Sequence, residues 1–180
     1  MEVTAAMRLK GLKEGFMRIA LIAGLLSLTL ATGAVKAQMP DEHAIEAVIH
    51  RLFIGMERGD SAMVNSTFRS DVAFVTIYRD KQNNPHLERE PSSEEFLKAV
   101  GTPHADVWHE EIWNLSIHVD GDFAQAWCDY AFYLGNNFSH CGVDAFQLYR
   151  ETSGWRIFQL TDTRRKVPCE IPEPIRMKHR

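Results

Sequence analysis

The segment GVDAFQLYRETSGWRI, residues 142–157, carries the pattern that decides the fold. Alternate residues of a strand share one face, so Phe146 and Leu148 would both point into a core. A short turn follows, and Trp155 and Ile157 then begin a second strand with the same alternation. The segment therefore predicts a β-hairpin with one buried face, and a four-residue loop pairs Leu148 with Ile157.

Two polar residues fall on the same predicted face as this core. By strand parity, His140 and Asp144 point the same way as Phe146. The same register sets Phe146 against Gln159 and Asp144 against Thr161. An acid and an imidazole on a core face indicate that one end of the face opens to water or lines a pocket, and we expect them to mark its mouth.

Upstream of this hairpin the chain changes from helical to strand patterns. Apolar residues at intervals of three and four predict an amphipathic helix over residues 41–58, ended by Gly59. The order predicts an α+β fold, in which a curved antiparallel sheet wraps over a long N-terminal helix and two shorter helices to form a half-open cone. The other expected elements are helices at 61–68 and 92–100, a loop at 81–91, and strands at 71–78, 107–119, 123–134, 139–150 and 155–163.

Two more strands supply candidate pocket residues. In 123–134, the preferred register turns the small residues and Tyr130 and Phe132 inward, whereas a one-residue slip would turn Trp127 and Tyr133 inward instead. In 107–119, we expect an inward apolar face whose parity also turns His109 and Glu111 inward. The inward apolar residues expected there are Trp113, Leu115, Ile117 and Val119.

The inward polar residues define a candidate catalytic site. A carboxylate in a dry pocket has a raised pKa, so Asp144 is a candidate general base, with His140 or Tyr130 assisting as shuttle or donor. Each of the three has an alternative structural role, as a satisfied core group or an exposed strand end. The candidate ligand-binding residues are His109, Glu111, Phe132, Phe146, Gln159 and Thr161.

The sequence gives little support for a metal or a cofactor. Side chains of His109, Glu111, His140 and Asp144 are chemically able to bind a metal, but no closely spaced ligand motif accompanies them. We therefore expect neither a metal nor a cofactor.

The N-terminus has the features of a secretory signal. Basic residues precede an apolar run at 19–31, and small residues at 35 and 37 suit a signal peptidase. The run is short for a membrane span, so we expect cleavage after Ala37, no stable anchor, and a periplasmic or secreted protein. Translation could start at Met1 or Met17. The predicted organisation is a signal at 1–37, one domain at 38–166 and a proline-rich tail at 167–180.

Charge and cysteine content narrow the partners. The chain has 20 Lys and Arg against 24 Asp and Glu, a net charge of −4, and no basic stretch interleaved with aromatic residues, so nucleic acid is not an expected partner. The three cysteines, Cys128, Cys141 and Cys169, permit one disulfide and one free thiol, or three buried thiols.

Three segments carry a resemblance to a known superfamily. They are MERGD at 56–60, DGDFAQAW at 120–127 and the hairpin at 142–157. With the element order, they resemble the nuclear transport factor 2-like superfamily, with its cystatin-like cone, and within it an exported lumazine-binding-like or SnoaL-like branch. The resemblance implies a small-molecule pocket. Similar enzymes are cofactor-free isomerases, cyclases and dehydratases that use an acidic or histidine base.

Three functional hypotheses follow. The first is a cone that binds a small, mainly apolar molecule without chemistry. The second is a cofactor-free isomerase, cyclase or dehydratase with Asp144 as base. The third is an interaction domain that forms a homodimer through the outer face of its sheet, where Trp127 and Tyr133 would lie in the preferred register.

Overall fold

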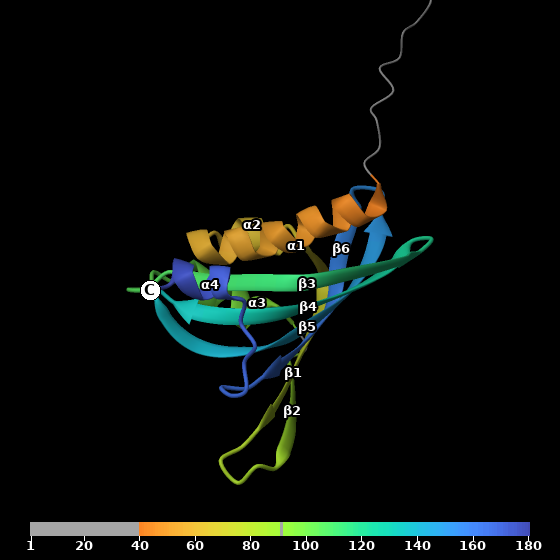
Figure 1. The fold of residues 1–180 in the computed structure, drawn as a ribbon. Coiled ribbons are helices and arrows are strands. Elements are labelled where there is room, and N and C mark those ends of the chain that lie inside the picture. The colour runs from red at the N-terminus through yellow and green to blue at the C-terminus, as the bar shows by residue number, and fades with distance from the viewer. Residues whose placement is uncertain (1–39, 91) are drawn as a thin grey trace, which may run out of the picture. The chain divides into compact units, whose positions relative to one another are not determined.

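The computed structural model describes residues 40–90 and 92–180, so the predicted signal at 1–37 lies outside the described residues. Within the described residues, six strands form one sheet, and four helices accompany it (Figure 1). The elements are α1 (Asp41–Arg58), α2 (Ser61–Asn65), β1 (Phe68–Arg79), β2 (Pro85–Glu90), α3 (Glu94–Gly101), β3 (Trp108–Asp120), β4 (Phe123–Leu134), β5 (Asn137–Glu151), β6 (Gly154–Arg164) and α4 (Glu173–Lys178).

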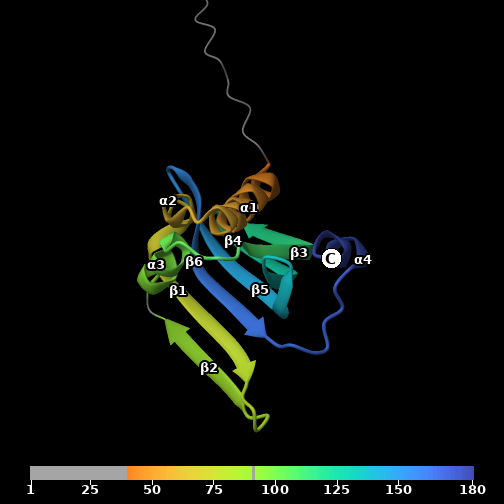
Figure 2. The same ribbon diagram turned by 90° about the vertical axis from the view of Figure 1, so that its left-hand side faces the viewer.

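The strands run side by side in the order β2-β1-β6-β5-β4-β3 (Figure 2). Strands β3 to β6 form the predicted antiparallel meander. Strand β1 pairs in parallel with β6 and antiparallel with β2, so the sheet is mixed. The predicted α+β, cystatin-like class is confirmed, with this parallel pair as the one change to the expected antiparallel sheet.

Helix α1 lies across the inner face of the sheet. Its apolar stripe, including Ile45, Ile49 and Leu52, is buried against small residues of β4 such as Ala124 and Ala126. Small side chains on the concave face let the helix approach closely, and burial of each large aliphatic side chain contributes about 1.5–3 kcal/mol. The predicted helix at 41–58 and the preferred register of β4 are therefore both confirmed.

Two local predictions were wrong. Residues 81–91 are not only a loop, because residues 85–90 form β2, an edge strand that is exposed along its whole length. Its polar sequence PHLERE has no buried face, which is why periodicity missed it. The helix predicted at 61–68 is shorter, because α2 ends at Asn65, and the strand predicted at 71–78 begins earlier, because β1 starts at Phe68.

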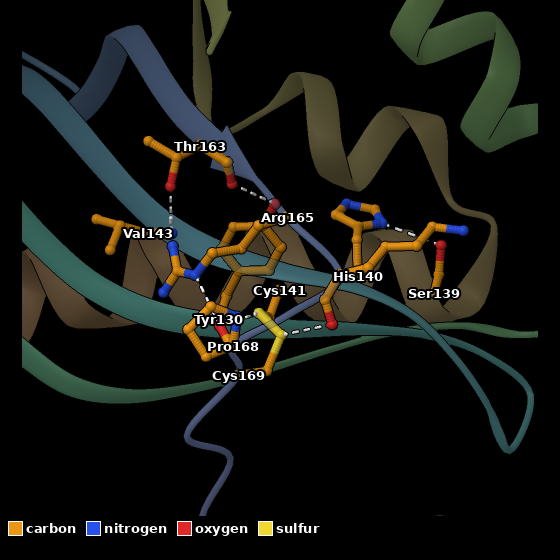
Figure 3. The surroundings of a disulfide bond; sticks show 10 residues. Tyr130, Ser139, His140, Cys141, Val143, Thr163, Arg165, Pro168 and Cys169 are labelled. Carbon is orange, nitrogen blue, oxygen red and sulfur yellow. Dashed lines mark hydrogen bonds between the residues drawn. A yellow bond between two sulfur atoms is a disulfide. The ribbon is translucent and has the colours of Figure 1, made fainter. Parts of the chain in front are cut away.

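The proline-rich tail contains the helix α4. Ile175 of this helix packs against Ala131 and Tyr133 of β4, which alternate with the inward residues and so lie on the outer face. A disulfide joins Cys141 of β5 to Cys169 just before the helix (Figure 3). Of the alternatives left open by the sequence, the structure has one disulfide and one buried free thiol, Cys128.

Candidate ligand site in the cone

One cross-strand row of the sheet carries polar side chains, whereas the next row is apolar. Asp144 of β5 lies directly opposite Asp162 of β6, which is next to Thr76 of β1. One row further along, Phe146 lies opposite Leu160. The inner face of the sheet therefore changes from apolar to polar between two neighbouring rows of paired residues.

This change in polarity lies in the wall of a cavity of about 370 Å³. Helix α1 contributes Leu52, Phe53 and Met56 to the wall. The other apolar lining is largely aromatic, and the polar lining comes from the strands and the rim. A cavity of this size and mixed lining is typical of a small-molecule site. Its aromatic lining residues, apart from Phe53 and Tyr130, are Phe74, Phe96, Trp108 and Phe132.

The Asp162 carboxylate is held by three donors from three strands. Thr76 Oγ1 donates to it at 2.6 Å, Arg164 Nε at 2.6 Å and Tyr130 Oη at 3.3 Å. The Arg164 contact is also an ion pair. Three donors satisfy this carboxylate. The guanidinium of Arg164 is one of them, so its Nε is already bound to the cavity wall.

Tyr130 is buried against the backbone of β6. Its hydroxyl donates to the Thr163 carbonyl at 2.9 Å, and burial raises its pKa above the usual value. Gly142 is paired with Tyr130 across β4 and β5, and a Cβ there would lie 2.8 Å from the Tyr130 ring and collide with the Thr163 carbonyl. Glycine at this position is therefore what lets Tyr130 and β6 approach.

Glu110 and Asp144 form a pair of carboxyl groups that favour the protonated state. Asp144 is 3% exposed, and burial together with the charge of Glu110 raises its pKa well above the usual value. Burial and the nearby Asp162 carboxylate raise the pKa of Glu110 to about 8. The two groups lie within hydrogen-bonding reach of each other, so a shared proton relieves their repulsion.

His140 lines the same cavity as a neutral imidazole. Burial, with a further contribution from the Arg164 charge, lowers its pKa to about 4. Its ring lies against Tyr130 and Phe132, with centroids 5.7 and 5.2 Å away, and its Nδ1 is 3.0 Å from Ser139 Oγ. Figure 3 shows His140 and the disulfide-bonded Cys141 on opposite sides of β5. The structure thus brings the three candidate catalytic residues, Asp144, His140 and Tyr130, to one cavity; their catalytic roles stay predictions.

The predicted inward orientation of His109 and Glu111 was wrong. The pairing of β3 with β4 shifts between Trp113 and Ser116, and Asn114 there has a positive φ of 54°. This bulge reverses the parity of the strand. Glu111 lies by the C-terminal helix instead, 2.8 Å from Lys178 Nζ and 3.1 Å from His179 Nε2.

The bulge also turns His109 and Trp113, in the same half of β3, toward the outer face of the sheet. The His109 ring lies tilted against that of His179, with centroids 5.3 Å apart, and Trp113 packs in the outer cluster under α4. Leu115, Ile117 and the residues beyond keep the predicted inward face. The cavity is lined instead by Glu110, a residue that the straight-strand pattern assigned to the outer face.

The predicted inward orientation of Gln159 and Thr161 was also wrong, because of a second bulge. The register of β5 and β6 shifts between Gln147 and Leu148, so the Leu148–Ile157 pair is as predicted, but Asp144 faces Asp162 instead of Thr161. Gln159 and Thr161 therefore alternate with the cavity residues, and Gln159 Nε2 donates to Thr161 Oγ1 at 3.3 Å on the outer face.

The two aromatic ligand candidates fall on either side of the cavity boundary. Phe132 lines the cavity as expected. Phe146 is fully buried in the core and packs edge-on against Phe53 with centroids 6.3 Å apart, so it does not line the cavity. The inward orientation of Phe146 was right, but its place is one row too deep to meet a ligand.

Sequence reasoning missed Glu110 and Asp162 as cavity residues. The run Asp162–Arg164 reads as a solvated strand end, and only the bulge in β6 turns it inward. Asn114, a residue type that tolerates positive φ in the middle of an apolar alternation, is the one signal of the bulge in β3. No comparable signal marks the bulge in β6.

Within residues 40–90 and 92–180, no group of three His, Cys, Asp or Glu side chains is arranged to hold a metal ion. The helices of this same part of the chain include none long and apolar enough to cross a membrane.

The fold and cavity define an α+β cone of the nuclear transport factor 2-like (NTF2-like) class. A family model described as "Putative lumazine-binding" matches residues 40–161, and the chain belongs to this family. A comparison with curated proteins finds no match.

Solved structures share the fold at low sequence identity. An NTF2-like protein with a cystatin-like fold from Novosphingobium aromaticivorans superimposes with a TM-score of 0.59 at 14% identity, over 72% of this chain and 84% of that one. A cystatin-like protein of unknown function from Nostoc punctiforme gives 0.57 at 13% identity, over 74% and 98%. A "putative dehydratase" of the NTF2-like family from Streptomyces avermitilis gives 0.53 at 15% identity, over 69% and 96%. These likenesses show the fold.

Proposed function

We propose that this protein binds a small, mainly apolar molecule in the cone and holds one polar group of it against the acidic row. The observation that carries the proposal is the cavity of about 370 Å³, in which an aromatic lining meets the carboxyl groups of Asp144 and Glu110. Apolar walls supply affinity, and a few buried polar groups supply orientation.

Native mass spectrometry of the protein purified from its own host tests this proposal. We expect a small molecule to remain bound and to be released by denaturation. Ala99 lines the cavity, so Ala99→Trp should fill it and abolish the bound mass, whereas Ala62→Trp on the exposed surface of α2 should not. An empty wild-type protein that also fails to take up any apolar probe would contradict the proposal.

A second function, cofactor-free proton transfer, is favoured by the Glu110–Asp144 pair. A carboxyl group with a raised pKa in a dry cavity can exchange a proton with a carbon acid near neutral pH. Isomerases, cyclases and dehydratases all need such a step, and one of the similar structures is described as a "putative dehydratase".

Deuterium exchange separates this second function from binding alone. The ligand recovered from the protein, incubated with enzyme in D₂O, should gain deuterium at carbon with the wild type and not with Asp144→Asn. Binding without exchange by both proteins supports the first function and contradicts the second.

We also propose that the protein is exported. A basic segment followed by an apolar run at 19–31 supports a cleaved leader, and the Cys141–Cys169 disulfide suits an oxidising compartment. Mass spectrometry of the protein from its host should find Gln38 as the first residue. A retained leader would contradict cleavage.

A further inference from the structure

We propose that the ligand of this cavity is an apolar organic cation, an amine whose ammonium group is bound by the Glu110–Asp144 pair. This inference rests on the proposed binding function and names its ligand class. It starts from the charges of the cavity lining, which has six acidic side chains and one basic side chain, Arg164.

The single basic side chain does not balance the acids. Arg164 is paired with Asp162 through its Nε at 2.6 Å, and Asp162 receives two more hydrogen bonds, so the one basic charge is offset by one of the six acids. The remaining lining carboxyl groups have no cationic partner in the part of the chain that the structure describes. The cavity is therefore built with a surplus of negative charge.

Asp144 is a buried carboxyl group that receives no hydrogen bond from an N–H or hydroxyl donor of the described residues. It is 3% exposed and lines the cavity. Among residues 40–90 and 92–180, only the Glu110 carboxyl lies within hydrogen-bonding reach of its side chain. A buried carboxyl group without a donor is costly, and another carboxyl group can satisfy it only by contributing a proton. A ligand ammonium would supply the missing donor and the missing charge together.

The rim and walls suit the same ligand. Glu90 and Glu95 line the exposed rim, where Coulomb attraction raises the local concentration of cations. Inside, Trp108 and Phe132 belong to the aromatic lining, and aromatic rings attract organic cations. An anion or a neutral acid would gain neither interaction.

Protonation of the pair explains how the empty cavity is stable. Without a ligand, the pair retains a proton that an entering ammonium displaces into solvent. The affinity for an amine should then rise with pH until the pair is ionised. The other titratable or charged groups that face the pair are Cys128 and Tyr130 from β4, His140 from β5, Asp162 and Arg164 from β6, Glu88 and Glu90 from β2, and Glu95 from α3; α1 contributes only apolar side chains.

Three probes with one ring system and different charges test the inference. Tryptamine, tryptophol and indole-3-propionate carry an ammonium, a hydroxyl and a carboxylate group on the same indole. Isothermal titration calorimetry at pH 6, 7 and 8, in buffers of different ionisation heat, measures affinity and proton release together. A primary alkylamine stays protonated below about pH 9.

We expect tryptamine to bind about tenfold or more tightly than tryptophol at pH 8, with indole-3-propionate weakest. Its affinity should rise by up to about tenfold per pH unit between pH 6 and 8, with release of a proton on binding. Asp144→Asn should remove the preference for the amine. Glu46→Gln, which removes an acid from the exposed face of α1, should leave it unchanged.

The outcomes separate the two proposals. If tryptophol or indole-3-propionate binds as tightly as tryptamine, the cavity binds small apolar molecules but the cationic class is wrong. If tryptamine binds best but without proton release or pH dependence, the Glu110–Asp144 pair is not its site, and the inference fails. If none of the three binds, the cationic class is wrong, and the native mass spectrometry described above decides whether the binding function itself stands.

Discussion

At the residue scale, Gly142 determines how closely the strands can meet beside the cavity. Gly142→Ala would drive a Cβ into the Thr163 carbonyl and the Tyr130 ring. We expect a loss of about 2–3 kcal/mol in the free energy of unfolding. Gly121→Ala is the matched control, because its Cβ would meet nothing within 4 Å and only the positive φ of 59° opposes it, at about 1 kcal/mol. Urea denaturation measures both, and equal losses would contradict the close-approach argument.

The carboxyl pair predicts a specific pH dependence of stability. The folded state raises the pKa of Glu110 and Asp144, so between about pH 4 and pH 8 it binds more protons than the unfolded state. Stability contributed by the protonated pair is therefore present below pH 4 and lost as pH rises to 8.

Asp144→Asn removes the repulsion while keeping the shape of the side chain. We expect the variant to be more stable than the wild type by about 1–3 kcal/mol at pH 8, and by much less at pH 4. Chemical denaturation at pH 4, 6 and 8 checks this. A variant destabilised equally at all three values would show that Asp144 has a structural hydrogen-bonding role instead.

His140 should titrate far below an ordinary histidine. Burial and the Arg164 charge lower its pKa to about 4, so its ring should stay neutral at pH 5. A histidine Cε1–H signal followed by NMR between pH 3 and 8 measures this directly. Arg164→Gln should raise the pKa, because it removes a nearby positive charge. A midpoint near 6.5 would place His140 in water instead of in the cavity wall.

At the element scale, the sequence predicts strands well but not the points where their faces reverse. The alternation correctly assigns the inward faces of β4 and of the apolar half of β3. One extra residue near Asn114 then reverses the rest of β3, and a second bulge reverses the end of β6. Because the side-chain period is two, a single bulge exchanges every later residue between the faces. Strand alternation therefore assigns two of the acidic cavity residues, Glu110 and Asp162, to the wrong surface.

The C-terminal segment shows a different limit. Residues 167–180 contain prolines and little apolar periodicity, which predicts a tail, yet Ile175 and the disulfide hold α4 against the sheet. Three cysteines do not specify their pairing, and a six-residue helix has too few turns for a periodic signal. Only the tertiary contact with Tyr133 and its neighbours decides this element.

Loss of the disulfide should lower stability measurably. Cys169→Ser opens a link between residues 28 apart in sequence, which corresponds to about 3–4 kcal/mol in the loop-entropy model. Reductant should lower the thermal midpoint of the wild type and of Cys128→Ser, but not that of Cys169→Ser. A wild-type midpoint that does not respond to reductant would contradict a stabilising role for the bond.

At the scale of the whole molecule, the order of helices and strands was enough to predict the cone. The helical and alternating patterns are long and distinct between α1 and β6, and short turns leave the meander few alternatives. The parallel pairing of β1 with β6 joins segments far apart in sequence, and no local pattern specifies it. No local pattern specifies the pairing of β2 either, because this strand pairs with the free edge of β1.

The predicted homodimer would form through the outer face of the sheet. The structure narrows the expected surface, because Tyr133 is covered by α4 and stacks on His179 with centroids 3.9 Å apart. Trp127 remains 48% exposed, and the directly paired Phe123 and Tyr149 are 43% and 44% exposed on the same face. A group of three exposed aromatic side chains on one sheet face is typical of the centre of a protein–protein interface.

Sedimentation velocity over a concentration series tests this surface. We expect a wild-type dimer that Trp127→Ala weakens by about tenfold or more, because truncation of a central tryptophan removes about 2 kcal/mol or more of binding energy. Leu87→Ala is the matched control, since Leu87 is 59% exposed but lies on the edge strand β2. A monomeric wild type contradicts the dimer. Equal weakening by the two variants would contradict an interface centred on Trp127.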